Sequence, residues 1–140
     1  MIGYLDTSAL VKLFLRDEDD AATVRDVIAA LDVVYASRIA QVEGRAALAA
    51  ARRAGRITAG GHATAKQDLD RAVGSLRIIE LHPSLARAAG DIAERLELRA
   101  LDAVHLASAL ALGGRDTVVI TWDRTLAFAA TKAGLAVAPG

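Results

Sequence analysis

Carboxylate side chains stand at widely separated points of this 140-residue chain, where a folded sheet could bring them to one rim. The set in question is Asp6, Glu43, Asp102 and Asp123. Carboxylates that converge repel one another, so such a rim needs a compensating cation. Hard oxygen ligands select Mg²⁺ or Mn²⁺. A divalent ion of this kind supports phosphoryl chemistry, because it neutralises the phosphate and turns a bound water into a nucleophile.

Asp6 gives the clearest local signal. It directly follows the apolar run Ile2–Leu5 and precedes a nearly all-apolar helical pattern, so it should lie where a buried strand meets a helix. Its charge must there be paired, hydrogen-bonded or bound to a metal, because burying it bare would cost roughly several kcal/mol or more. Hydroxyl groups near the acids could orient water or phosphate, although helix capping and strand propensity explain them almost as well: Thr7, Ser8 and Thr121.

The elements that would position these acids alternate along the chain. Apolar or β-branched runs predict strands over residues 2–5, 33–36, 76–81, 117–121 and 135–138. Helical spacing, caps and glycine stops predict helices over 8–15, 17–31, 38–54, 58–73, 84–96, 98–110 and 124–133, with Ser37 as a cap of the third. This alternation predicts one α/β domain over residues 1–140, with a mainly parallel central sheet of four to five strands and helices on both faces.

In a parallel sheet, the ends of the strands and the starts of the following helices meet at one rim. Asp6 and Asp123 follow strands. Glu43 falls in the second turn of the helix after the second strand, and Asp102 falls in the first turn of a later helix. Alone, each acid is explained as a helix cap, a complement to a helix dipole or a surface charge. Together they predict a metal centre.

Other residues compete for a role at the rim. Asp32 and Asp116 precede strands and therefore belong to the opposite rim. Glu80 is an ambiguous competitor near the end of the third strand, which we expect at an edge of the sheet. His105 lies one helical turn beyond Asp102, but a lone histidine in an apolar helix is more often a packed, hydrogen-bonded core residue than a ligand.

Composition limits the partners and the location. The chain has no cysteine, so any metal must be held by oxygen or by histidine nitrogen. Lys+Arg 17 balance Asp+Glu 17, so a nucleic acid would be attracted by local patches only. The clearest patch is Arg52, Arg53 and Arg56, which a solvated helix end explains equally well. Neither a signal peptide nor a membrane span is indicated, which predicts a cytoplasmic location by default.

Four segments together resemble the acidic motifs of the PIN-domain ribonucleases, and most closely the VapC-type toxins of bacterial toxin–antitoxin pairs. They are Leu5–Leu13 (LDTSALVKL), Glu43 in its helix, Leu101–Ala107 (LDAVHLA) and Thr121–Asp123 (TWD). The resemblance covers nearly the whole chain, in order. The combination is specific although each motif alone is weak, and Trp122 departs from the residue that many relatives carry at that place.

The resemblance implies a single PIN-like nuclease domain over residues 1–140. It also implies a metal-dependent endonucleolytic cut in RNA, with Mg²⁺ as cofactor and Mn²⁺ as an alternative. Partners would be a cognate antitoxin that blocks the site and a second copy of the chain. Catalysis would rest on Asp6, Glu43, Asp102 and Asp123, with Asp6, Asp102 and Asp123 on the metal and Thr7, Ser8 and Thr121 in support.

Three alternatives compete with this function. A haloacid-dehalogenase-like phosphatase would need a second aspartate two residues after Asp6, where the chain has Ser8. A phosphate-accepting receiver module would need a lysine soon after a late strand, and Lys132 lies deep in the last predicted helix. A catalytically silent PIN scaffold that binds RNA or protein is the strongest rival, and the presence of the whole acidic set argues against it.

Overall fold

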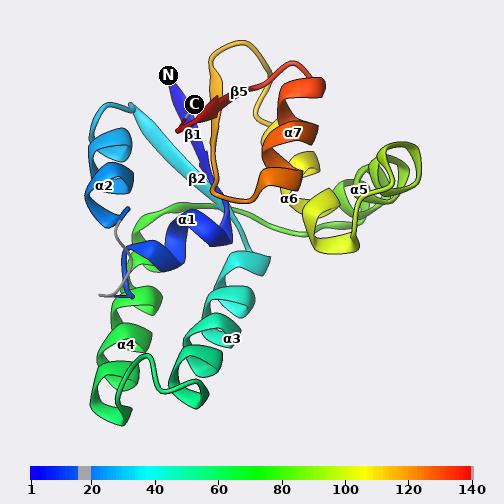
Figure 1. Ribbon diagram of the computed structural model, residues 1–140. Coiled ribbons are helices and arrows are strands. Elements are labelled where there is room, and N and C mark those ends of the chain that lie inside the picture. The colour runs from blue at the N-terminus through cyan, green and yellow to red at the C-terminus, as the bar shows by residue number, and fades with distance from the viewer. Residues whose placement is uncertain (16–19, 140) are drawn as a thin grey trace.

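The computed structural model describes residues 1–15 and 20–139, and in them the strands form one parallel sheet (Figure 1). The strand order is β3-β2-β1-β4-β5, with every neighbouring pair parallel. The strands are β1 (Ile2–Leu5), β2 (Val33–Ser37), β3 (Arg77–Ile79), β4 (Thr117–Ile120) and β5 (Ala136–Ala138). The predicted α/β class, the parallel sheet and the edge position of the third strand are thereby confirmed.

Helices cover both faces of the sheet. They are α1 (Thr7–Lys12), α2 (Ala21–Ala29), α3 (Ile39–Arg53), α4 (Ala59–Ser75), α5 (Pro83–Leu96), α6 (Ala100–Leu110) and α7 (Arg124–Lys132). Successive strand residues point to opposite faces. Accordingly, Leu5 and Ile120 join the core beneath α1 to α4, whereas Tyr4 and Val119 join the core beneath α5 to α7. Figure 1 shows α3 and α4 on one side and α5, α6 and α7 on the other.

The two central strands determine where the rim begins. In the β1–β4 register, Leu5 lies opposite Ile120, so Asp6 and Thr121 are the next residues on adjacent strands. All four residues of β4 are buried, as expected of a strand covered on both faces. The sheet therefore brings the ends of two distant segments side by side.

Close helix packing fixes α3. A Cβ added at Gly44 would lie 2.9 Å from the Leu69 side chain of α4, closer than side-chain atoms tolerate. Gly44 therefore lets α4 approach closely the helix segment that carries Glu43.

Several predicted boundaries were wrong. The third strand ends at Ile79 instead of residue 81, because the exposed Glu80 side chain forms an ion pair with Arg38 on the surface. The first helix ends at Lys12 instead of Leu15. Arg38, not Ser37, occupies the N-cap position of α3, although the Ser37 hydroxyl still accepts a hydrogen bond from the Ile39 amide at 3.3 Å.

Two further expectations concern the start of the second helix and membrane-spanning segments. The predicted start of the second helix, residues 17–19, lies outside the described residues, and the described helix begins at Ala21. Among the helices of residues 1–15 and 20–139, none is long and apolar enough to cross a membrane.

Candidate active site

Asp6 lies in a cage of neutral hydrogen-bond donors at the end of β1. Its side chain caps α1 by accepting the Ala9 amide at 2.9 Å. The Ser8 hydroxyl donates to Oδ1 at 2.7 Å, and the Thr121 hydroxyl donates to Oδ2 at 2.7 Å. Only 3% of Asp6 is exposed. The cage fixes the carboxylate rotamer and removes it from bulk water.

Burial dominates the electrostatics of Asp6. Desolvation raises the pKa of the Asp6 carboxyl, and the hydrogen bonds from Ala9, Thr121 and Ser8 offset that effect only in part. An ionised Asp6 is therefore costly in the bare protein. A cation at the rim would reverse this shift, because an opposite charge nearby favours the ionised carboxylate.

Glu43 lies in a second cage, formed by a hydroxyl and an imidazole. Thr7 Oγ1 donates to Glu43 Oε1 at 2.7 Å, and His105 Nε2 lies 2.7 Å from the same oxygen. Desolvation of the half-buried Glu43 would raise its pKa, but the hydrogen bonds from His105 and Thr7 outweigh it and hold the pKa of this carboxyl below its ordinary value. Glu43 therefore stays ionised at neutral pH.

A buried tyrosine completes this cage from below. The Tyr4 hydroxyl lies 2.7 Å from His105 Nδ1, and Tyr4 is fully buried. Burial raises the pKa of Tyr4, so the phenol keeps its proton. A neutral imidazole protonated at Nε2 satisfies every contact, because Tyr4 then donates to Nδ1 while Nε2–H donates to Glu43.

The prediction for His105 as a packed, hydrogen-bonded residue is confirmed, since only 3% of it is exposed. Its bond to Glu43, and the part played by Tyr4, were missed. The available signal was Tyr4 itself, because a tyrosine inside a buried strand needs a partner for its hydroxyl. The sequence does not show which of the distant polar residues that partner is.

Asp102 and Asp123 fill the roles expected of helix starts. Asp123 Oδ1 caps α7 by accepting the Leu126 amide at 2.9 Å. Asp102 lies in the first turn of α6, where Arg99 Nε approaches its Oδ2 at 3.4 Å. Among the described residues, these bonds engage one oxygen of each carboxylate.

Hydrogen bonds link some of the predicted site residues but not Asp102. The Asp123 amide donates to Thr121 Oγ1 at 3.0 Å, so one hydroxyl joins Asp123 to Asp6. Thr7 and Ser8 are neighbours in the chain and serve Glu43 and Asp6 respectively. Asp102 has no recorded bond to the other acids and is placed one helical turn before His105 on α6.

Trp122 contacts two residues of α1. Its backbone amide donates to the Ser8 hydroxyl at 2.9 Å, and its ring lies 5.2 Å from Lys12 Nζ in a cation–π contact.

Glu80 is removed as a competitor, because its exposed carboxylate pairs with Arg38, whose hydrogen bond lowers the pKa of Glu80. Arg52 and Arg53 lie in the last turn of α3, where cations complement the helix dipole.

The carboxylate oxygens of the rim are the kind of ligand that hard divalent ions prefer. Within residues 1–15 and 20–139, no group of three or more histidine, aspartate or glutamate side chains is arranged to hold a metal by itself. Mg²⁺, however, commonly takes one or two carboxylates and completes its shell with water and substrate phosphate. Asp6 and Asp123, which the Thr121 hydroxyl joins, supply carboxylate oxygens of the kind that this mode uses.

The chain resembles known proteins over most of its length. Residues 3–132 match the PIN domain family. Ribonuclease VapC49 from Mycobacterium tuberculosis is 42% identical over 136 residues, which cover 97% of this chain and 94% of the relative.

Solved structures share the fold. The structure of PAE2754 from Pyrobaculum aerophilum aligns with a TM-score of 0.72 at 24% identity, covering 98% of this chain and 92% of that one. A toxin–antitoxin complex from Klebsiella pneumoniae aligns with a TM-score of 0.62 at 19% identity, covering 86% of each chain. Because the family model matches residues 3–132 and VapC49 is 42% identical, the chain belongs to the PIN-domain family, among the VapC-type ribonucleases.

Proposed function

We propose that this chain is the toxin of a toxin–antitoxin pair and cuts RNA endonucleolytically, with Mg²⁺ or Mn²⁺ as cofactor, at the rim of Asp6, Glu43, Asp102 and Asp123. Asp6 is the observation that carries the proposal. It is a nearly fully buried carboxyl group at the end of a central strand, its hydrogen-bond donors are neutral, and burial raises its pKa. Such a group calls for a cation. Membership of a family of ribonucleases supports RNA as the substrate.

Asp6, Asp102 and Asp123 would hold the ion together with waters, and the ion would supply an activated water and neutralise charge on the phosphate. The chain's own residues do the rest. Ser8 and Thr121 lock Asp6 in one rotamer. The preorganised rim needs no rearrangement when charge develops on the phosphate.

Glu43 receives the proton in this scheme. Its Oε1 is engaged by Thr7 and His105, which leaves Oε2 to accept a proton from the attacking water. The water oxygen bonds to phosphorus as the bond from phosphorus to the leaving ribose oxygen breaks. The leaving oxygen then takes a proton from solvent. His105 and Tyr4 act as positioning residues, because they hold Glu43 without touching the reacting atoms.

The alternatives receive less support. Ser8 occupies the place of the second aspartate of a haloacid-dehalogenase-like site and donates to Asp6, which ties up the would-be nucleophile. A silent scaffold is less favoured, because capping α1 alone does not require a buried carboxylate whose ionised form is costly.

A groove between α1 and α4 supports the antitoxin as partner. A cavity of about 490 Å³ lies between the end of α1 and the start of α4, where Leu13, Phe14 and Ile57 supply apolar surface. A toxin–antitoxin complex is among the structures that share this fold. We expect the antitoxin to cover this groove, and the free chain to associate as a homodimer, which sedimentation of the purified protein tests.

Cleavage is tested with protein purified free of its antitoxin, on a broad panel of RNAs, in Mg²⁺, Mn²⁺ or EDTA. Wild type should cut in either ion and not in EDTA, and Asp6→Asn should lose at least about 100-fold in rate. Asp116→Asn is the matched control, because it changes an exposed aspartate at the opposite rim and should cut like wild type. Equal activity of wild type and Asp6→Asn would refute the proposal.

Metal binding is tested separately by thermal unfolding. Millimolar Mg²⁺ should raise the melting temperature of wild type, because binding to the folded state stabilises it. The shift should vanish in Asp6→Asn and persist in Asp116→Asn. An unchanged melting temperature of wild type would argue against a metal site at this rim.

A further inference from the structure

The outer face of α7 carries an aromatic side chain between two cations. Arg124, Phe128 and Lys132 follow one another at four-residue spacing, which places them along one face of the helix. Their Cα atoms are therefore about 6 Å apart from one to the next, given a rise of about 1.5 Å per residue. All three are exposed, Phe128 at 71%, while Leu126, Ala129 and Ala130 bury the opposite face. The core is complete without Phe128.

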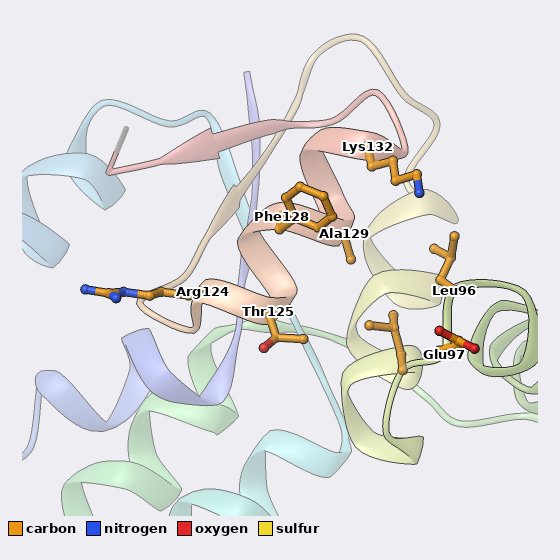
Figure 2. A pocket seen from close by; sticks show the side chains of 8 residues that line it. Leu96, Glu97, Arg124, Thr125, Phe128, Ala129 and Lys132 are labelled. Carbon is orange, nitrogen blue, oxygen red and sulfur yellow. The ribbon is translucent and has the colours of Figure 1, made fainter.

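A hollow adjoins this strip, as Figure 2 shows. Its volume is about 430 Å³, within the range of pockets that take small ligands. Leu96, at the end of α5, faces Phe128 and Ala129 of α7 across it, and Leu98 adds apolar surface to the lining. Glu97 is the one acidic residue of its lining, held in a left-handed backbone conformation with φ of 53°. The surface is therefore an apolar recess with a cation at each end.

The strip starts at the proposed active site. Asp123 caps α7, so Arg124 is the first residue beyond the acidic rim. Within the described part of the chain, neither Arg124 nor Lys132 takes part in an ion pair. With a formal net charge of zero, the chain can attract a polyanion only through such local cations.

We propose that this face of α7, namely Arg124, Phe128 and Lys132, is a binding strip for single-stranded RNA that leads the strand to the rim. Phe128 stacks on a base, and the two cations contact the flanking phosphates. Stacking on an aromatic ring combined with a line of cations is the general mode of single-strand recognition. Glu97 can accept a hydrogen bond from an exocyclic amine of a base in the recess. The inference rests on the proposed function, since it assigns the path of that substrate.

The test measures binding of a fluorescent, unstructured RNA oligonucleotide by anisotropy, in the Asp6→Asn background so that the RNA stays intact. Phe128→Ala should weaken binding about 5-fold to 100-fold, as loss of one stacked base does. Phe128→Leu should weaken it similarly because it keeps apolar area without a ring, whereas Phe128→Trp should retain it. Phe128 is exposed, so these variants should keep the melting temperature of the parent.

The cations are tested by the salt dependence of the same binding. Arg124→Ala and Lys132→Ala should each reduce the slope of log K against log salt by about 0.7, the value for one phosphate contact on a single strand. Arg71→Ala, on α4, removes the same charge from an exposed position elsewhere and should leave the slope unchanged.

Binding equal to the parent in both Phe128→Ala and Phe128→Leu, with unchanged salt slopes for the two cation variants, would overturn the strip. If Phe128→Ala instead dissociated a dimer in sedimentation without changing RNA binding, the face would belong to a second copy of the chain and the proposal would be wrong. Failure of the proposed function has a different signature: no cleavage by the wild-type protein, with Phe128-dependent RNA binding intact in the Asp6→Asn background.

Discussion

Asp6 and Glu43 accept hydrogen bonds from the neighbouring residues Ser8 and Thr7, respectively. Their surroundings nevertheless shift their pKa values in opposite directions. Asp6 is nearly fully buried among neutral donors, and desolvation raises its pKa. Glu43 is only half buried, and the bonds from His105 and Thr7 lower its pKa. Two carboxylates of different environment commonly divide two roles in an active site. Here Asp6 is suited to bind a cation, and Glu43, which stays ionised, is suited to act as the general base.

The largest expected effect separates the two carboxylates by stability rather than by activity. Asp6→Asn and Glu43→Gln should each lower the rate of RNA cleavage at least about 100-fold. In EDTA, however, Asp6→Asn should raise the melting temperature because it removes a buried charge, whereas Glu43→Gln should lose about 1 kcal/mol of unfolding free energy with its charge-assisted bonds. Glu80→Gln, an exposed glutamate at the sheet edge, is the control. Stability changes of the same sign in Asp6→Asn and Glu43→Gln would contradict the proposed difference between the two carboxylates.

The next effect concerns the residues that hold Glu43. His105→Ala should lower the free energy of unfolding by about 2–4 kcal/mol, because it leaves a cavity and strips Tyr4 and Glu43 of their partner. Tyr4→Phe should cost about 1 kcal/mol, since only the hydroxyl is lost. Both are measured by urea unfolding. If His105→Ala unfolded like wild type, the Tyr4–His105–Glu43 chain would have no structural role.

The smallest effect is a pair of opposite pH dependences in EDTA. The stability that protonated Asp6 provides is fully present below its ordinary pKa of 3.8 and is lost as pH rises through the raised folded value. The stability that ionised Glu43 provides is present above its ordinary pKa of 4.5 and is lost as pH falls through the lowered folded value. The advantage of Asp6→Asn over wild type should therefore grow with rising pH. The deficit of Glu43→Gln should shrink in acid, and parallel pH curves would contradict both assignments.

The sequence predicted the rim better than the contacts within it. Asp6 and Thr121 could be placed because each ends an apolar strand run, and parallel strands bring such ends together. The bond between Glu43 and His105 could not, because it joins side chains 62 positions apart and depends on how α3 packs against α6. Sequence periodicity specifies which face of a helix is apolar, but not the side-chain pairing between helices.

Edges were also poorly predicted, for a local reason. The run from Leu76 to Leu81 favours a longer strand, but Glu80 pairs with Arg38 and Leu81 is 43% exposed, so the ladder stops at Ile79. An edge strand has one neighbour, and surface ion pairs can therefore end it. Metal ligation by Asp6, Asp102 and Asp123 stays a prediction.

The most direct measurement is an NMR titration of the side-chain carboxyl carbons of Asp6 and Glu43, first in EDTA and then with Mg²⁺. Without metal, the pKa of Asp6 should lie above 3.8 and that of Glu43 below 4.5. Mg²⁺ should bring the pKa of Asp6 down, because a nearby cation favours the ionised carboxylate. A pKa of Asp6 at or below 3.8 in EDTA, or one that Mg²⁺ leaves unchanged, would contradict the assignment of Asp6 to the metal.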